Sequence, residues 1–218
     1  MVGFAKANPQ TKATPMTTIL RIAAAATLIS LAACSQAPAE APPVTGSAWT
    51  LDAAASDLNY VTIKSGEIAE VNSFETLNGG VTDDGTATVV IDLTSVSTGV
   101  DIRDERMRDI LFNVAETPTA SVTATIDPAS FEALKVGEST MTTLDGTLSL
   151  KGIEAPFQAE VNVTRTGADS VTAASAKPVI VEAARLELTD GLAELQGLAG
   201  LPSITPVVPV TFSLTFTR

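Results

Sequence analysis

The sequence contains no histidine and a single cysteine, Cys34. A Ser-His-Asp triad, a Cys-His pair and a histidine-ligated zinc site are therefore excluded, and no disulfide can form within the chain. Carboxylate pairs such as Asp83 with Asp84 remain, but they stand in turn contexts that predict exposure rather than the burial that tunes a catalytic carboxyl. A phosphate-cradling glycine loop is also absent. We therefore expect no enzyme, no cofactor and no metal site.

Basic residues are also scarce, with 13 Lys and Arg against 25 Asp and Glu and a net charge of −12. Three of the basic residues, Lys6, Lys12 and Arg21, precede Cys34, whereas no acidic residue does. A chain beginning at Cys34 would keep 10 basic and 25 acidic residues, a net charge of −15. Nucleic acid is excluded as a partner because phosphate binding needs a basic face, and anionic membrane surfaces would be repelled.

The first 33 residues have the pattern of an export signal. An apolar run extends from Ile22 to Ala33, broken only by Thr27 and Ser30, behind the basic residues. A run of this length ending in small residues is typical of a signal peptide, and it is shorter than the roughly 20 residues that a membrane-spanning helix needs. Met16 would open a more ordinary signal, so the start at Met1 is open.

The signal ends in Leu31, Ala32, Ala33 and Cys34, which resembles the lipobox of bacterial lipoproteins. We expect Cys34 to be acylated and to become the mature N-terminus; the alternative is a buried free thiol. A Pro- and Ala-rich segment follows and predicts a flexible tether over residues 34–48. Because Ser35 follows Cys34, the resemblance to sorted lipoproteins favours an exported, lipid-anchored protein at the outer membrane, facing the periplasm.

From Trp49 onward most of the sequence alternates apolar and polar residues with a period of two, as in half-buried antiparallel strands. The clearest case is 208–217, where one side is wholly apolar. Asn78 to Gly80, Asp83 to Gly85, Lys151 with Gly152, and Thr166 with Gly167 predict turns between strands. The other expected strands are 58–65, 68–77, 89–93, 121–126, 144–150, 157–164 and 171–181.

One segment, 101–114, breaks the alternation. Met107, Ile110, Leu111 and Val114 fall at i, i+3, i+4 and i+7, which predicts an amphipathic helix. Its charged residues, among them Asp104, are interpreted as solvated ion pairs on the outer face. A second short helix is possible over 192–199. About eight strands with one or two short helices predict an all-β fold, a closed or nearly closed antiparallel barrel without exposed edges.

The inward positions of these strands are mostly Val, Leu, Ile and Ala, and aromatic residues make up only 4% of the chain. An eight-stranded barrel either fills itself with side chains or encloses a small ligand. A lining of this kind would give a narrow apolar tube suited to a long hydrocarbon, and each buried methylene would contribute about 0.8 kcal/mol. The alternative is a dry core, and composition leaves both open.

Residues 101–126 read DIRDERMRDILFNVAETPTASVTATI and resemble the hallmark segment of the YceI-like polyisoprenoid-binding family, with Arg103, Asp104, Phe112 and Pro118 at the matching places. Residues 91–99 and 146–156, and the opening from Trp49, are similar to the family as well. The resemblance implies an extended eight-stranded, lipocalin-like antiparallel barrel that holds a polyisoprenoid lipid or quinone tail without catalysis. It also implies export and a homodimer as one possible assembly.

Departures from the family pattern lie at Ala55 and Lys151, where relatives often carry His, and at Glu154, where they usually carry Thr. They concern the mouth of the barrel and any contact with a head group. Arg103 is expected to fix the helix against Asp104 or a nearby carbonyl rather than to bind ligand.

These observations predict a signal over 1–33, a tether over 34–48 and a YceI-like barrel over 49–218. The leading hypothesis is a membrane-tethered isoprenoid carrier or sink, with the lipid anchor as the contact to the membrane. The alternative is a structural or protein-interaction lipoprotein with a side-chain-filled barrel. Met107 and Leu111 are expected to close the tube from the helix. Its expected lining is Val89, Ile91, Leu93, Val122, Ile126, Leu148, Val161, Phe212, Leu214 and Phe216.

Overall fold

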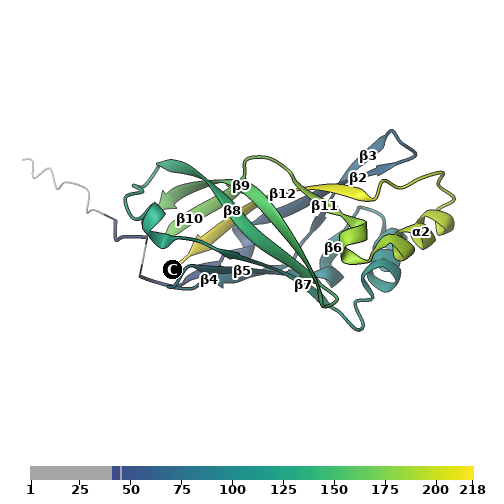
Figure 1. Ribbon diagram of the computed structural model, residues 1–218, viewed down its shortest axis with the longest axis horizontal. Helices are drawn as coiled ribbons and strands as arrows, with labels where there is room; N and C mark the ends of the chain where they lie inside the picture. Colours follow the sequence, from purple (N-terminus) through teal and green to yellow (C-terminus); the bar gives the residue numbers. More distant parts are fainter. Residues whose placement is uncertain (1–40, 45) are drawn as a thin grey trace, which may run out of the picture. The chain divides into compact units, whose positions relative to one another are not determined.

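The computed structural model describes residues 41–44 and 46–218 (Figure 1). The predicted export signal, Cys34 and the first part of the predicted tether lie outside the described residues. The strands are β1 (Trp49–Leu51), β2 (Asp57–Lys64), β3 (Ile68–Phe74), β4 (Leu77–Val81), β5 (Thr86–Asp92), β6 (Val96–Ser97), β7 (Thr119–Thr125), β8 (Ser139–Leu150), β9 (Ile153–Gly167), β10 (Ser170–Ser175), β11 (Val179–Glu182) and β12 (Val207–Thr217). The helical segments are η1 (Ala53–Ala55), η2 (Leu93–Ser95), α1 (Asp101–Arg106), η3 (Met107–Phe112), η4 (Pro128–Phe131), η5 (Ala183–Leu186) and α2 (Thr189–Leu198).

The strands form one antiparallel sheet that closes on itself. Four long strands are each broken in two, as β1 with β2, β3 with β4, β5 with β6, and β10 with β11, and each pair follows the same neighbours along the sheet. The ring closes where β1 pairs with β12, at Thr50 with Thr217 and Leu51 with Phe216. The predicted eight-stranded antiparallel barrel is therefore confirmed, and its closure leaves the ring without a free edge at this point.

The predicted turn at residues 78–80 is wrong, because these residues belong to β4. Gly79 pairs with Val89 of β5, and Gly80 pairs with both Thr88 of β5 and Thr50 of β1. A Cβ on Gly79 would lie 2.0 Å from the Thr88 carbonyl oxygen, and one on Gly80 would lie 2.3 Å from the Trp49 carbonyl oxygen. The glycines thus allow neighbouring backbones to approach closely inside the sheet, and this is a common reason for glycine within a strand.

Two of the other predicted turns, at 83–85 and 151–152, are confirmed, while Thr166 and Gly167 still belong to β9 and the chain turns at the next two residues. Lys151 and Gly152 both have positive φ, 53° and 77°. This is the backbone of a two-residue hairpin turn whose twist matches that of the flanking strands.

The helix expected over 101–114 is confirmed, but it changes type along its length. α1 is followed by the π-helical turn η3, and Asn113, with φ of 51°, ends it in the left-handed region. Bonding from i to i+5 places Met107 and Phe112 on one face. Both are buried together with Leu111, whereas Ile110 and Val114 are only partly covered.

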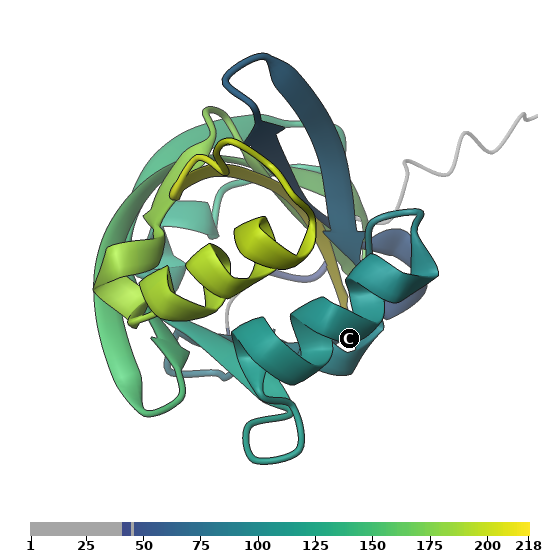
Figure 2. The ribbon, with the colours of Figure 1, turned by 90° about the vertical axis from the view of Figure 1, so that its right-hand side faces the viewer.

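The second helix, expected over 192–199, is α2. It packs directly on η3 at Gly191, where an added Cβ would lie 3.1 Å from the Ile110 carbonyl oxygen. Viewed along the barrel, α2 and the α1–η3 segment both lie across one end, which we call the helix-covered end (Figure 2).

The opposite end of the barrel is closed by the side chain of Arg165, and we call it the Arg165 end. Arg165 on β9 is 2% exposed, and its guanidinium donates to the carbonyls of Leu134 at 3.1 Å, Ala168 at 2.8 Å, Gly167 at 3.2 Å and Pro42. The strand expected from the sequence, 157–164, ended before Arg165, so its inward position was not predicted. The buried cation is accommodated because backbone carbonyls satisfy its donors.

The last residues of the predicted tether pack against this end. Trp49 Nε1 donates to the Val44 carbonyl at 3.1 Å, and the Arg218 guanidinium lies 4.6 Å from the centre of the Trp49 ring. Arg218 also donates to the carbonyl of Pro43 at 2.7 Å. Residues 42–44 are therefore attached to the barrel rather than forming part of a free linker.

Candidate functional site

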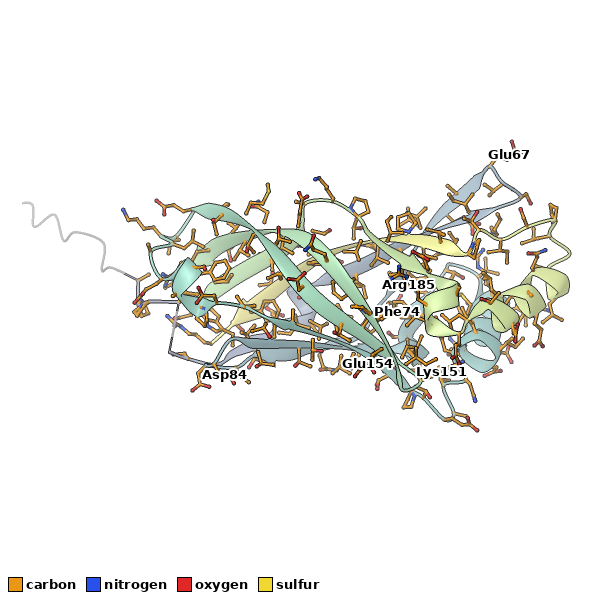
Figure 3. All side chains as sticks on the ribbon, in the orientation of Figure 1. Glu67, Phe74, Asp84, Lys151, Glu154 and Arg185 are labelled. Carbon is orange, nitrogen blue, oxygen red and sulfur yellow. The ribbon has the colours of Figure 1, made fainter. Side chains whose placement is uncertain are left out.

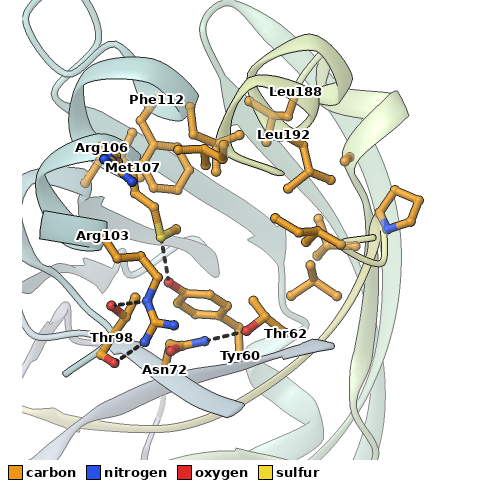
Figure 4. A pocket seen from close by; sticks show the side chains of 18 of the residues that line it. Tyr60, Thr62, Asn72, Thr98, Arg103, Arg106, Met107, Phe112, Leu188 and Leu192 are labelled. Atoms are coloured by element: carbon orange, nitrogen blue, oxygen red, sulfur yellow. Dashed lines mark hydrogen bonds between the residues drawn. The ribbon is translucent and has the colours of Figure 1, made fainter. Parts of the chain in front are cut away.

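A cavity of about 440 Å³ lies at the helix-covered end, and its size falls in the range of small-molecule sites (Figure 4). Its walls come from β2, β3, β5, β7, β8, β11 and β12, and α1, η3, η5 and α2 cover it. A second, smaller cavity of about 100 Å³ lies at the Arg165 end, lined among others by Trp49, Phe131 and Val171. The two cavities share no lining residue. We call the larger one the main cavity.

Five of the predicted lining residues line the main cavity, and two line the smaller one. Phe216 and Ile126 belong to the smaller cavity. The residues of the main cavity are Ile91, Leu93, Met107, Leu111 and Leu148, so the expectation that η3 closes the space agrees with the geometry.

The other five predicted lining residues lie in packed interior and border neither cavity. Along β12, Val208 lines the main cavity and Phe216 the smaller one, while Phe212 and Leu214 lie between them. The remaining three are Val89, Val122 and Val161, of which Val161 is 0% exposed. The expected continuous tube is therefore interrupted by a packed middle, because side chains from all strands meet there.

Several lining residues were missed from the sequence. Leu188, Leu192 and Leu195 line the cavity from α2 and the residue before it, at i, i+4 and i+7. That spacing is a helical signal that could have been found. The aromatic residues Tyr60 and Phe74 carried no comparable signal, since the pairing of β2 with β3 decides that they face inward. Their ring centres are 5.4 Å apart, and a third ring, that of Phe112, lies 5.9 Å from Phe74.

One side of the main cavity is polar and is organised by Arg103. Its Nε donates to Thr98 Oγ1 at 2.7 Å, and Nη2 donates to the Thr98 carbonyl at 2.6 Å. Nη1 pairs with Glu70 Oε2 at 2.7 Å. The predicted bond from Arg103 to a nearby carbonyl is thereby confirmed. Lys64 Nζ lies 2.6 Å from the same Glu70 oxygen, and its hydrogen bond, with the charge of Arg103, holds the pKa of Glu70 below its usual range.

Asp104 does not lie on the solvated outer face, where the sequence interpretation placed it. It is 9% exposed and accepts hydrogen bonds from the Thr98 backbone N–H at 3.0 Å and from the Thr98 hydroxyl. The interpretation failed because loop residues before a helix can turn their donors onto a carboxylate of its first turn, which helical spacing alone does not reveal.

Tyr60 and Asn72 place two further polar groups at the cavity wall. Burial, reinforced by the charge of Asp104, raises the pKa of the Tyr60 hydroxyl, which therefore stays neutral. Among the described residues, its hydrogen-bond partner is the Met107 sulfur, at 3.9 Å. Asn72 Nδ2 donates to Thr62 Oγ1 at 3.0 Å. Within the described residues the buried Asn72 Oδ1 has no hydrogen-bond partner.

Lys151, one of the departures from the family pattern, supports the helical cover of the cavity (Figure 3). Its Nζ donates to the Leu111 carbonyl at 2.8 Å, near the end of η3. A cation at this position satisfies a carbonyl that the helix leaves free and complements the negative end of its dipole. The β8–β9 turn thus ties η3 to the barrel.

Within residues 41–44 and 46–218, no cluster of three or more His, Cys, Asp or Glu side chains could hold a metal ion. In the same part of the chain, no helix combines the length and apolarity required to span a bilayer.

A closed antiparallel barrel with an apolar cavity beneath helices at one end is an architecture that can enclose a small apolar ligand. The family model of the YceI-like domain matches residues 49–216, and the chain therefore belongs to the YceI-like family. The comparison with curated proteins gave no match.

Solved structures show the same fold. A polyisoprenoid-binding domain from Saccharophagus degradans, described as implicated in plant cell wall breakdown, is 38% identical with a TM-score of 0.76; the match covers 78% of this chain and 98% of that one. BcnA from Burkholderia cenocepacia is 18% identical with a TM-score of 0.58, over 76% of this chain and 98% of that one. The second likeness concerns the fold alone.

Proposed function

We propose that the protein binds the chain of a long polyisoprenoid lipid or isoprenoid quinone in the main cavity, without catalysis. The observation that carries this proposal is a cavity of about 440 Å³ beneath helices, whose lining residues are mostly apolar. The 38% identity to a domain described as polyisoprenoid-binding supports the same ligand class. In this proposal the protein is a carrier or a sink for such lipids.

Apolar contact alone can provide the affinity. Each buried methylene contributes about 0.8 kcal/mol, so several isoprene units in the cavity would offset the cost of immobilising a flexible chain. Because Val161 and its neighbours fill the middle of the barrel, the hydrocarbon chain of the lipid ends at that level in the main cavity. The remainder of a longer hydrocarbon chain extends past the helices or displaces packed side chains.

Ala120 offers a way to test the ligand position. It is buried on β7 and lines the main cavity. We expect Ala120→Phe to fill part of the cavity and to weaken binding of farnesol at least about tenfold, the effect of losing contact with two or three methylenes. Isothermal titration calorimetry measures the affinity, and thermal melting verifies the fold.

Thr123→Phe is the matched control, since this residue of the same strand is exposed and lines neither cavity. Its farnesol affinity should equal that of the unmodified protein. Equal affinity of folded Ala120→Phe would argue that farnesol binds elsewhere, and absence of farnesol uptake by the unmodified protein would argue against the function.

Attachment to a membrane through acylated Cys34 is the second part of the proposal, and the sequence from Leu31 to Cys34 supports it. We expect Cys34→Ser to leave the protein unprocessed or to release it into the soluble fraction. Cell fractionation with mass determination of the N-terminus measures this. Retention of a correctly cleaved Cys34→Ser protein in the outer-membrane fraction would contradict the anchor.

The packed middle of the barrel favours a second function, that of a structural or protein-interaction lipoprotein. A loss of farnesol affinity in Ala120→Phe would contradict this second function, because a barrel filled with side chains has no cavity for the lipid.

A further inference from the structure

The charged residues that line the main cavity have the opposite sign to the protein as a whole. The chain has 25 acidic and 13 basic residues, yet the cavity is lined by Lys64, Arg103 and Arg106 and by no Asp or Glu. The two arginines come from α1 and lie across the cavity from Leu188 and Leu192 (Figure 4). The cavity thus has a cationic side and an apolar side.

The cationic side has N–H groups that are not engaged in hydrogen bonds. Arg103 has five N–H groups, three of which donate to Thr98 and Glu70. Lys64 has three N–H groups, one of which is directed to Glu70. The side chain of Arg106 makes no hydrogen bond or ion pair with another described residue. Of the nearby carboxylates, Glu70 pairs with both Lys64 and Arg103, and Asp104 accepts hydrogen bonds from Thr98. The guanidinium of Arg106 therefore lines the cavity with no carboxylate of the described residues bound to it.

We propose that this cationic side binds the anionic head group, a phosphate or a carboxylate, of a lipid whose chain lies on the apolar side. This inference rests on the proposed function and narrows its ligand class to anionic lipids. An anion matches both the cationic lining and its free donors, and guanidinium groups bind such oxygens in pairs. A neutral quinone head would offer these donors no charged acceptor. The apolar surroundings strengthen the attraction, since they lower the local dielectric.

The test compares prenyl ligands that differ only in the head. Farnesyl phosphate, farnesol and farnesoic acid share the farnesyl skeleton and present a phosphate, a hydroxyl and a carboxylate, and inorganic phosphate has no chain. We expect farnesyl phosphate to bind at least about tenfold more tightly than farnesol at low salt, as for a charge-assisted hydrogen bond, and this preference to shrink as salt is raised. Inorganic phosphate should not compete. A farnesoic acid affinity above that of farnesyl phosphate would identify the head as a carboxylate.

Arg106→Gln should reduce the ratio of farnesyl phosphate affinity to farnesol affinity severalfold. The matched control is Arg108→Gln, which makes the same change of charge two residues away, at a position that does not line the cavity, and which should keep the ratio of the unmodified protein. If Arg106→Gln fails to fold, the salt dependence of the preference in the unmodified protein tests the inference instead. Equal binding of farnesol and farnesyl phosphate at low salt overturns the inference while the proposed function stands. If none of the three prenyl compounds binds, the proposed function itself is overturned.

Discussion

Val161→Asp is expected to unfold the barrel domain. Val161 lies on β9 in the packed middle between the two cavities and is 0% exposed. A carboxylate there would have neither water nor a cationic partner, and burying it costs several kcal/mol even if it takes up a proton. That cost is comparable with the entire stability of an ordinary domain, about 5–15 kcal/mol. Circular dichroism and thermal melting of the purified variant measure the effect.

Asn162→Asp is the control for this experiment. It adds the same charge at the next residue of β9, whose side chain is exposed on the outer face. Its melting temperature should stay within a few degrees of the unmodified protein, since exposed substitutions usually change stability by no more than about 0.5 kcal/mol. A Val161→Asp protein that melts like Asn162→Asp would show that the middle of the barrel is not packed.

Arg165→Met is expected to destabilise the domain by about 3 kcal/mol or more. The guanidinium donates to four backbone carbonyls, from Leu134, Gly167, Ala168 and Pro42, and has no ion pair in the described part of the chain. Methionine keeps much of the aliphatic volume but removes every donor. The Leu134 carbonyl is buried and loses its partner at a cost of about 1–3 kcal/mol, and the loss of three part-buried hydrogen bonds adds to this. Denaturant unfolding measures the free energy of unfolding.

The same substitution should release residues 41–44 from the Arg165 end. Amide hydrogen exchange should be faster at Ala41 and Val44, the two residues of this segment that have an amide N–H, and near Leu134, with little change around the main cavity. Arg185→Met is the control, because Arg185 is 59% exposed on its side chain and pairs only weakly, at 3.5 Å, with Glu182. An Arg165→Met protein as stable as Arg185→Met would contradict the role of Arg165 as a buried clamp.

The two ends of the barrel therefore differ in what they contain. At the Arg165 end, the Arg165 guanidinium binds the Pro42 carbonyl, and the helix-covered end contains the main cavity. The packed middle separates them, so that changes at Arg165 should affect stability more than ligand uptake, and changes at Ala120 the reverse.

The amino-acid sequence alone determined the class of fold and much of its detail. The alternation in 208–217 predicted β12 to within one residue, because a strand with one buried face must repeat its apolar residues every second position. The stripe beginning at Met107 predicted the helix, and the segment from Asp101 to Ile126 indicated the family. The absence of histidine was sufficient to exclude a Ser-His-Asp triad and a histidine-ligated zinc site.

Only the tertiary structure decided where the interior is hollow. Period-two alternation tells which side chains face inward but not how far along the barrel they lie, so Phe212 and Leu148 looked equivalent although only Leu148 borders the main cavity. Whether space remains at a given level depends on the summed volumes of side chains from all strands and from the covering helices. The same holds for charge: Asp104 is buried and Arg106 lines the cavity because of how α1 rests on the barrel, a contact between segments distant in sequence.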